Sequence, residues 1–217
     1  MSLTAETIID QAARELNDSR ANAAADRTWS DPVLIAYLNN GIIQIALVRP
    51  DLSAKTASVK LVPGTRQALP ADAARLLSVV RNRGATGTVD GLVITQADRD
   101  SLDAVSPAWH ASRAAAVRNY VYDLRFGTAF YVYPGATDTI GVWVELIYSA
   151  IFTVTGLQDV VPLSDLCLSP LKHWIKYECL GKETDDATSA ERGQAHYTAF
   201  FQELGVKTTT DSSLPPD

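Results

Sequence analysis

The side chains best suited to acid–base or metal chemistry are spread thinly along this chain. Its three histidines are His110, His173 and His196, and no two of them have the spacing of a helical metal-binding motif. Cys167 and Cys179 do not form the closely spaced pair that a zinc site uses. The pattern predicts no metal site and no cofactor.

The two cysteines fall in a segment with a helical pattern of apolar residues. Their separation along such a helix corresponds to about 18 Å at a rise of about 1.5 Å per residue. A disulfide cannot span that distance. We therefore expect Cys167 and Cys179 to be small core residues of a protein made in a reducing cytosol.

Two further stretches resemble ligand-binding loops without meeting their requirements. The glycines of RGATGTVDG, residues 83–91, fit neither a dinucleotide fingerprint nor a P-loop, so a flexible hairpin tip is expected. DRDSLD, residues 98–103, lacks the glycine and the closing glutamate of a calcium loop. No serine stands in a G-x-S-x-G elbow. The sequence therefore predicts a protein that is not an enzyme.

Composition excludes several other classes. With 19 Lys and Arg against 25 Asp and Glu, the net charge is -6, which argues against a nucleic-acid grip by a basic surface. The densest group of basic residues is Arg75, Arg81 and Arg83. We expect these side chains to be exposed on a strand. No secretory signal opens the chain, and no apolar run approaches a membrane span, so no membrane contact is expected.

Helical patterns occupy the first fifty residues. Residues 4–16 predict a helix capped by Thr4, and WSDPVLIAYLNNGIIQIALVRP, residues 29–50, predicts a longer one with Ser30 as N-cap. Gly41 lies close to the apolar stripe of the second helix. A glycine there lowers helix propensity by about 1 kcal/mol, so we expect another helix to approach closely at this point.

The middle of the chain has the alternation of β-strands. ASVKLVPGTRQALP, residues 57–70, predicts a hairpin turning at Pro63 and Gly64, followed by a strand over 74–84. A short helix is expected over 95–105, with Thr95 and Asp98 at its start. Three more strands are expected near 117–123, 128–133 and 140–149.

Helical patterns return from residue 161. In the first of the two helices, Pro170 either kinks the helix or marks its start with Ser169 as cap. The second helix ends at Gly205, and a polar tail rich in proline follows. We expect an α+β fold in which a helical bundle, built from N- and C-terminal helices, carries an inserted antiparallel β-domain. The expected segments are bundle helices in 1–52, the β-domain in 53–160, bundle helices in 161–205 and a flexible arm in 206–217.

One stretch of the β-domain has apolar residues on both faces. NYVYDLRFGTAFYVYP, residues 119–134, predicts two strands joined by a turn. A surface hairpin needs only one apolar face, because only one face meets a core. Either a closed β-core or a neighbouring subunit can account for the second face.

Several of these landmarks, in this order, resemble the head-to-tail adaptor (connector) proteins of tailed bacteriophages, in particular the podovirus-type portal-to-tail adaptors. They are YLNNGIIQI within the second helix, VPGTRQALPADAARLLSVVRN, SPAWH before YVYDLRFGTAFYVYPGA, and the closing pair of helices. The resemblance covers nearly the whole chain and rests on order and spacing, since each motif alone is generic.

The resemblance implies a structural virion protein. Family members form a ring, typically a dodecamer, between the portal protein and the tail nozzle or next tail component. DNA passes through the lumen without specific binding, and the protein is made in the host bacterial cytoplasm. The C-terminal segment docks on the portal, which points to Val206, Lys207, Leu214, Pro215 and Pro216.

Aromatic side chains of the β-domain are expected to anchor the contact between subunits, since interfaces favour such residues. The candidates are Trp109, Tyr120, Tyr122, Tyr131 and Tyr133. The alternatives are a connector or terminator elsewhere in the tail, a monomeric module whose aromatic sheet binds carbohydrate or peptide, and an enzyme with a dispersed site.

Overall fold

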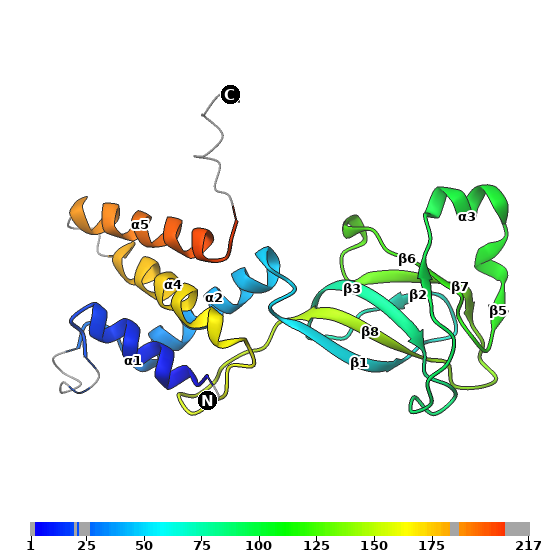
Figure 1. Ribbon diagram of the computed structural model, residues 1–217, viewed down its shortest axis with the longest axis horizontal. Coiled ribbons are helices and arrows are strands. Elements are labelled where there is room, and N and C mark those ends of the chain that lie inside the picture. Colours follow the sequence, from blue (N-terminus) through cyan, green and yellow to red (C-terminus); the bar gives the residue numbers. More distant parts are fainter. Residues whose placement is uncertain (1–2, 20, 22–26, 183–186, 207–217) are drawn as a thin grey trace, which may run out of the picture. The chain divides into compact units, whose positions relative to one another are not determined.

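The computed structural model describes residues 3–19, 21, 27–182 and 187–206 and has the predicted α+β class (Figure 1). The chain divides into two compact units. The helical unit comprises Met1–Leu52 and Phe152–Asp217, and the β unit comprises Ser53–Ile151. Both ends of the chain thus belong to the helical unit. The domain boundaries expected from the sequence remain predictions.

Four helices pack around one core in the helical unit (Figure 1). They are α1 (Ala5–Glu15), α2 (Asp31–Val48), α4 (Leu168–Leu180) and α5 (Ala187–Glu203), with a short turn, η4 (Asp165–Cys167), before α4. The central helix is α4, which contacts each of the other three. The core includes Ile8 and Ile9 of α1, Leu38 and Ile42 of α2, Leu171 and Ile175 of α4, and Phe200 of α5.

The helix ends follow their local sequence in most cases. The Thr4 hydroxyl accepts a hydrogen bond from the Thr7 amide at 3.3 Å and caps α1 as predicted. Gly205, with a φ of +71°, ends α5 as predicted. The start of α4 differs, because Cys167 occupies the N-cap position and Pro170 lies inside the first turn. Ser169 instead donates its hydroxyl to Glu203 of α5 at 2.9 Å.

The predicted close approach at Gly41 is confirmed. A Cβ atom at this position would lie 3.0 Å from Cδ1 of Trp174 and 3.1 Å from Cδ2 of Leu171, both on α4. The hydrogen of glycine therefore lets α2 and α4 pack with almost no space between them. The loss of helix propensity at Gly41 is offset by this contact.

By length and composition alone, α2 is apolar enough to cross a membrane, contrary to the expectation that no segment approaches that length. Its buried residues include Leu34, Leu38, Ile42 and Ile45, which belong to the core of the helical unit. The apolar character of α2 is thus accounted for by packing against the other helices.

The β unit contains two sheets (Figure 1). The first has the order β1 (Ala54–Lys60), β8 (Trp143–Ala150), β3 (Ala73–Asn82), all antiparallel. The second has the order β2 (Gly64–Ala68), β7 (Ala129–Ala136), β6 (Asn119–Val121), β4 (Thr95–Gln96), with β5 (Arg113–Ala114) also on β7. Only the two-residue strands β4 and β5 pair in parallel within the described residues.

The hairpin expected over residues 57–70 does not form. β1 pairs with β8, whereas β2 pairs with β7 in the other sheet, so Pro63 and Gly64 mark a crossing between sheets. The turn at Pro63 and Gly64 was predicted, but each strand pairs with a distant segment: Ala54 of β1 pairs with Ser149, and Ala68 of β2 pairs with Ala129. By contrast, the two strands expected in residues 119–134 do pair, as β6 and β7.

The core of the β unit includes side chains from both sheets, such as Val79 and Leu146 from one and Phe130 and Val132 from the other. Strand β3 buries every third residue rather than every second, because its pairing with β8 shifts register three times. Each shift inserts one residue, so the buried positions Ala73, Leu76, Val79 and Asn82 lie three residues apart.

The short helix expected over 95–105 forms as α3 (Arg99–Val105), but its cap is not Thr95. Asp98 is the N-cap and accepts from the Ser101 amide at 2.9 Å, while Thr95 belongs to β4. Two short turns complete the unit, η2 (Trp109–Ala111) and η3 (Leu124–Phe126).

The segment that returns from the β unit is tied to α2 by one side chain. Asn39 donates to the Val154 carbonyl at 2.9 Å and accepts from the Val154 amide at 2.8 Å. Val154 is buried, so both of its backbone groups depend on this amide. Neighbouring Asn40 is exposed, and its side-chain amide donates to Glu178 at 3.3 Å.

We predict that Asn39→Ala lowers the free energy of unfolding by about 1–3 kcal/mol, because it leaves two buried backbone groups of Val154 without partners. Asn40→Ala is the matched control and should change it by less than about 0.5 kcal/mol. Urea denaturation of both variants measures the difference. Equal losses would contradict the role given to Asn39.

Candidate functional site

The chemistry-bearing residues do not converge on a catalytic arrangement. His110 lies in the β unit, where its Nδ1 is 3.0 Å from the Thr65 hydroxyl. His173 and His196 meet in the helical unit with their Nδ1 atoms 2.8 Å apart, a contact that sequence reasoning missed. Among the described residues, no group of three potential metal ligands occurs.

Cys167 and Cys179 are both fully buried in the core of the helical unit, as predicted. Burial raises the pKa of the Cys167 thiol, which keeps it in the unreactive protonated form. These side chains therefore contribute packing.

The second apolar face of β7 is covered from within the same chain. Phe130 and Val132 point into the core, and Tyr131 and Tyr133 alternate with them on the opposite face. The Trp109 ring lies against both tyrosines, with ring centroids 6.0 and 6.3 Å apart in edge-to-face geometry. Trp109 thus gives the second face of the strand an intramolecular partner.

Trp109 is itself held in place by polar contacts. Its Nε1 donates to Asp103 at 2.7 Å, and its ring stacks on His110 with centroids 3.7 Å apart. Because Trp109 is almost fully buried, it acts as the central residue of a small second core.

The five aromatic residues predicted at a subunit interface lie in different environments. Trp109 and Tyr120 are buried in the β unit, so they do not offer an exposed surface. Tyr122, Tyr131 and Tyr133 are half-buried. The open aromatic face that a carbohydrate-binding module needs is not formed by this set. Their part in a subunit contact remains a prediction.

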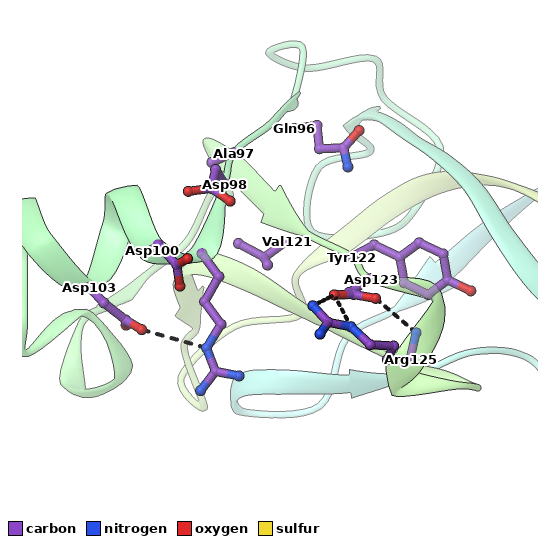
Figure 2. Close-up of a pocket in the computed structure, with 10 residues that line it drawn as sticks. Gln96, Ala97, Asp98, Asp100, Asp103, Val121, Tyr122, Asp123 and Arg125 are labelled. Atoms are coloured by element: carbon purple, nitrogen blue, oxygen red, sulfur yellow. Dashed lines mark hydrogen bonds and ion pairs between the residues drawn. The ribbon is translucent and has the colours of Figure 1, made fainter.

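A depression of the β unit with a volume of about 940 Å³ lies between α3 and η3 (Figure 2). Its lining is polar and rich in charge. Four carboxylates, from Asp98, Asp100, Asp103 and Asp123, face two guanidinium groups, from Arg99 and Arg125.

Two of these carboxylates, those of Asp98 and Asp123, are not suited to proton transfer. The Ser101 amide and hydroxyl, which donate to Asp98, hold the pKa of that carboxyl below its usual range. The hydrogen bonds from Arg125 do the same for Asp123, whose Oδ2 accepts from Arg125 Nε at 2.8 Å. Ionised, arginine-paired carboxylates suit an electrostatic contact with another protein better than acid–base catalysis.

The glycine-rich stretch 83–91 is a packed hairpin. Asn82 anchors it, because its side-chain amide donates to the carbonyls of Leu92 and Val117 and accepts from the Val117 amide, at 2.8–2.9 Å. At its tip, the Gly87 carbonyl accepts the Ser58 hydroxyl at 2.9 Å. Asp90 binds Arg81 and Arg83, which closes the hairpin.

This hairpin presents apolar side chains to solvent. Val89, Leu92 and Val93 are 62%, 73% and 68% exposed. We call these three residues the hairpin patch. A rigid loop that holds apolar groups in water is a feature of protein interaction surfaces. Sequence reasoning missed it, because a run with three glycines favoured mobility over fixed packing.

Of the residues predicted to dock on the portal, only Val206 is described. It is half-buried against the core of the helical unit, and its amide donates to the Phe201 carbonyl at 2.9 Å. Lys207, Leu214, Pro215 and Pro216 lie outside the described residues, and their role stays a prediction.

Comparison with known proteins gives one clear finding. The family model described as SU10 adaptor protein matches residues 3–216, nearly the whole chain. No curated protein matches the sequence.

The packing of the hairpin yields a test. Gly87 has a φ of +79°, and a Cβ there would lie 2.8 Å from Cδ2 and Cε3 of Trp143. We predict that Gly87→Ala lowers the free energy of unfolding by about 2–4 kcal/mol, from backbone strain and overpacking together.

Gly84→Ala is the control in the same hairpin. Gly84 also has a positive φ, +67°, but its Cβ would meet Val89 Cβ at 3.4 Å, an ordinary contact. Backbone strain alone should lower the free energy of unfolding by about 1–2 kcal/mol. Chemical denaturation compares the two, and a loss at Gly87 no larger than at Gly84 would mean that the hairpin does not pack on Trp143.

Proposed function

Because the chain belongs to the SU10 adaptor protein family, we propose that it is a ring-forming head-to-tail adaptor that joins the portal vertex to the tail of a bacteriophage. Proteins of this family are structural components of the phage particle. The observation that carries the proposal is the family match from residue 3 to residue 216. In this function the protein performs no reaction.

A ring requires two different surfaces on each subunit, because every copy contacts one neighbour on each side. The β unit supports this requirement with two surfaces of different chemistry. One is the apolar hairpin patch, and the other is the charged depression of Figure 2. Interfaces combine an apolar centre with a polar rim, so both kinds of surface suit a subunit contact.

The tyrosines predicted at the interface keep a part in this proposal. Tyr122 lines the depression, whereas Tyr131 and Tyr133 lie half-buried against Trp109 on the other face of β7. The buried Trp109 supports Tyr131 and Tyr133 from inside the β unit, while Tyr120 belongs to the core of that unit.

The net charge supports passage of DNA without specific binding. With a formal charge of -6, the chain lacks the surplus of lysine and arginine that would hold phosphates by counterion release. In this proposal the ring encloses the genome exit channel at the junction of portal and tail, and residues 206–217 dock on the portal. The protein would be made in the host cytoplasm before assembly.

Deletion of residues 206–217 tests the docking segment. The full-length and shortened chains are mixed with portal rings of the same virus and sedimented. We expect the full-length chain to pellet with the portal and the shortened chain to stay largely in the supernatant. Equal pelleting of both would reject the docking role, and no pelleting of either would favour a connector or terminator elsewhere in the tail.

A second test addresses the ring contact. We predict that Leu92→Ser raises the protein concentration needed for ring assembly by more than about tenfold, because burying a leucine contributes about 1.5–3 kcal/mol. Sedimentation velocity, with the portal present if rings close only there, measures assembly.

Leu166→Ser is the matched control, since Leu166 is 80% exposed but belongs to the helical unit. Neither variant should change the thermal unfolding temperature. Assembly of Leu92→Ser at the wild-type concentration would exclude the hairpin patch from the subunit contact.

A further inference from the structure

The contact between α4 and α5 contains a pair of imidazoles that the proposed function does not use. His173 and His196 approach through their Nδ1 atoms, 2.8 Å apart, with ring centroids 5.0 Å apart. At this distance only one hydrogen fits between the two nitrogens. One ring must donate, and the other must accept through an unprotonated Nδ1.

We propose that His173 and His196 form a proton-operated latch, which holds α5 against α4 while one Nδ1 is unprotonated and releases it when both rings are protonated. The reason is geometric. Two N–H groups directed at each other across 2.8 Å cannot hydrogen-bond, and the two positive rings repel each other.

The surrounding charges favour the first proton over the second. His173 Nε2 lies 3.5 Å from Oε1 of Glu203 on α5, so a charge on this ring has a counter-ion. Positive groups oppose a charge on His196. Lys176 is buried and lowers the pKa of both rings, Arg192 adds to its effect on His196, and Lys172 adds to its effect on His173.

A carboxylate on α1 holds the two lysines in place. Glu15 accepts from Lys172 at 2.7 Å and from Lys176 at 2.6 Å. Burial raises the pKa of Glu15, but the hydrogen bonds and charges of both lysines outweigh it and lower the pKa to about 2. Glu15 therefore stays ionised across the range in which histidines titrate, so the lysines keep their positions beside the pair.

The pKa directions agree with the latch. Burial, followed by the charges of Lys176 and His173, lowers the pKa of His196 to about 4. Burial and Lys176 also lower the pKa of His173, against the opposing effect of Glu203. Because the folded state binds fewer protons, the latch contributes its full stability above about pH 6.5 and loses it as the pH falls toward 4.

Opening of the latch would loosen a tight helix contact. The two helices are in van der Waals contact at Gly193, where a Cβ would lie 3.4 Å from Cβ of Leu180. The Trp174 and Phe200 rings also pack together, tilted by 59° with centroids 4.9 Å apart. Protonation of both rings therefore opens α5 locally and involves no binding partner. The test of the latch does not depend on the adaptor function.

Hydrogen exchange of the full chain, followed by mass spectrometry at about pH 7.5 and about pH 5, tests the latch. A histidine with the pKa lowered as for His196 raises the opening constant up to about thirtyfold between these values. Because the rings are half-buried, we expect peptides of α5 to exchange about fivefold faster at the lower pH, after correction for the chemical exchange rate.

His196→Asn is the decisive variant, because its amide places a donor and an acceptor near the position of Nδ1 and does not titrate. It should remove the acid-induced rise, whereas His110→Asn, in the β unit, should retain it. A rise that persists in His196→Asn, or no rise in the wild type, would overturn the proposal.

Nitrogen NMR of the wild-type histidines gives a second reading that needs no variant, should His196→Asn fail to fold. The latch predicts that His173 and His196 take up their protons in two separate steps. Simultaneous and independent titration of the two rings would also overturn the proposal.

Discussion

The contact of α2 with α4 at Gly41 is the constraint on which the rest of the helical unit depends. In the sequence, α2 precedes the segment that forms the β unit and α4 follows it. The two helices meet so closely that a Cβ atom at Gly41 would lie 3.0 Å from the Trp174 ring. Helix α4 also packs against α1 and against α5. The Asn39 side chain then fixes the returning segment at Val154.

The constraint in the β unit is different, because strands with apolar side chains on both faces must be buried on both faces. One face of β7 meets the core between the sheets, and Trp109 covers the other. The many aromatic residues of these strands therefore did not indicate a solvent-exposed surface. The hairpin patch offers aliphatic side chains to a partner, and the depression between α3 and η3 offers charged side chains together with the half-buried Tyr122.

Features set by local chemistry could be predicted from the sequence, and features set by distant pairing could not. Thr4, Gly41 and Gly205 were assigned correctly, because a cap, a close approach and a left-handed residue each leave a local sign. The prediction of a hairpin at Pro63 was wrong, because β1 pairs with β8, which lies far along the chain. The register shifts of β3 remove the regular alternation of buried and exposed residues that identifies a strand. The His173–His196 contact joins two helices, and no single sequence motif encodes how those helices pack.

The central claim is that several copies of this chain assemble on a portal ring. Light scattering measures it most directly, as the mass of the protein alone and then mixed with portal rings of the same virus. The account predicts a complex heavier than the portal by many copies of a 23.4 kDa chain, in a fixed ratio. A portal peak of unchanged mass beside a free monomer would contradict it.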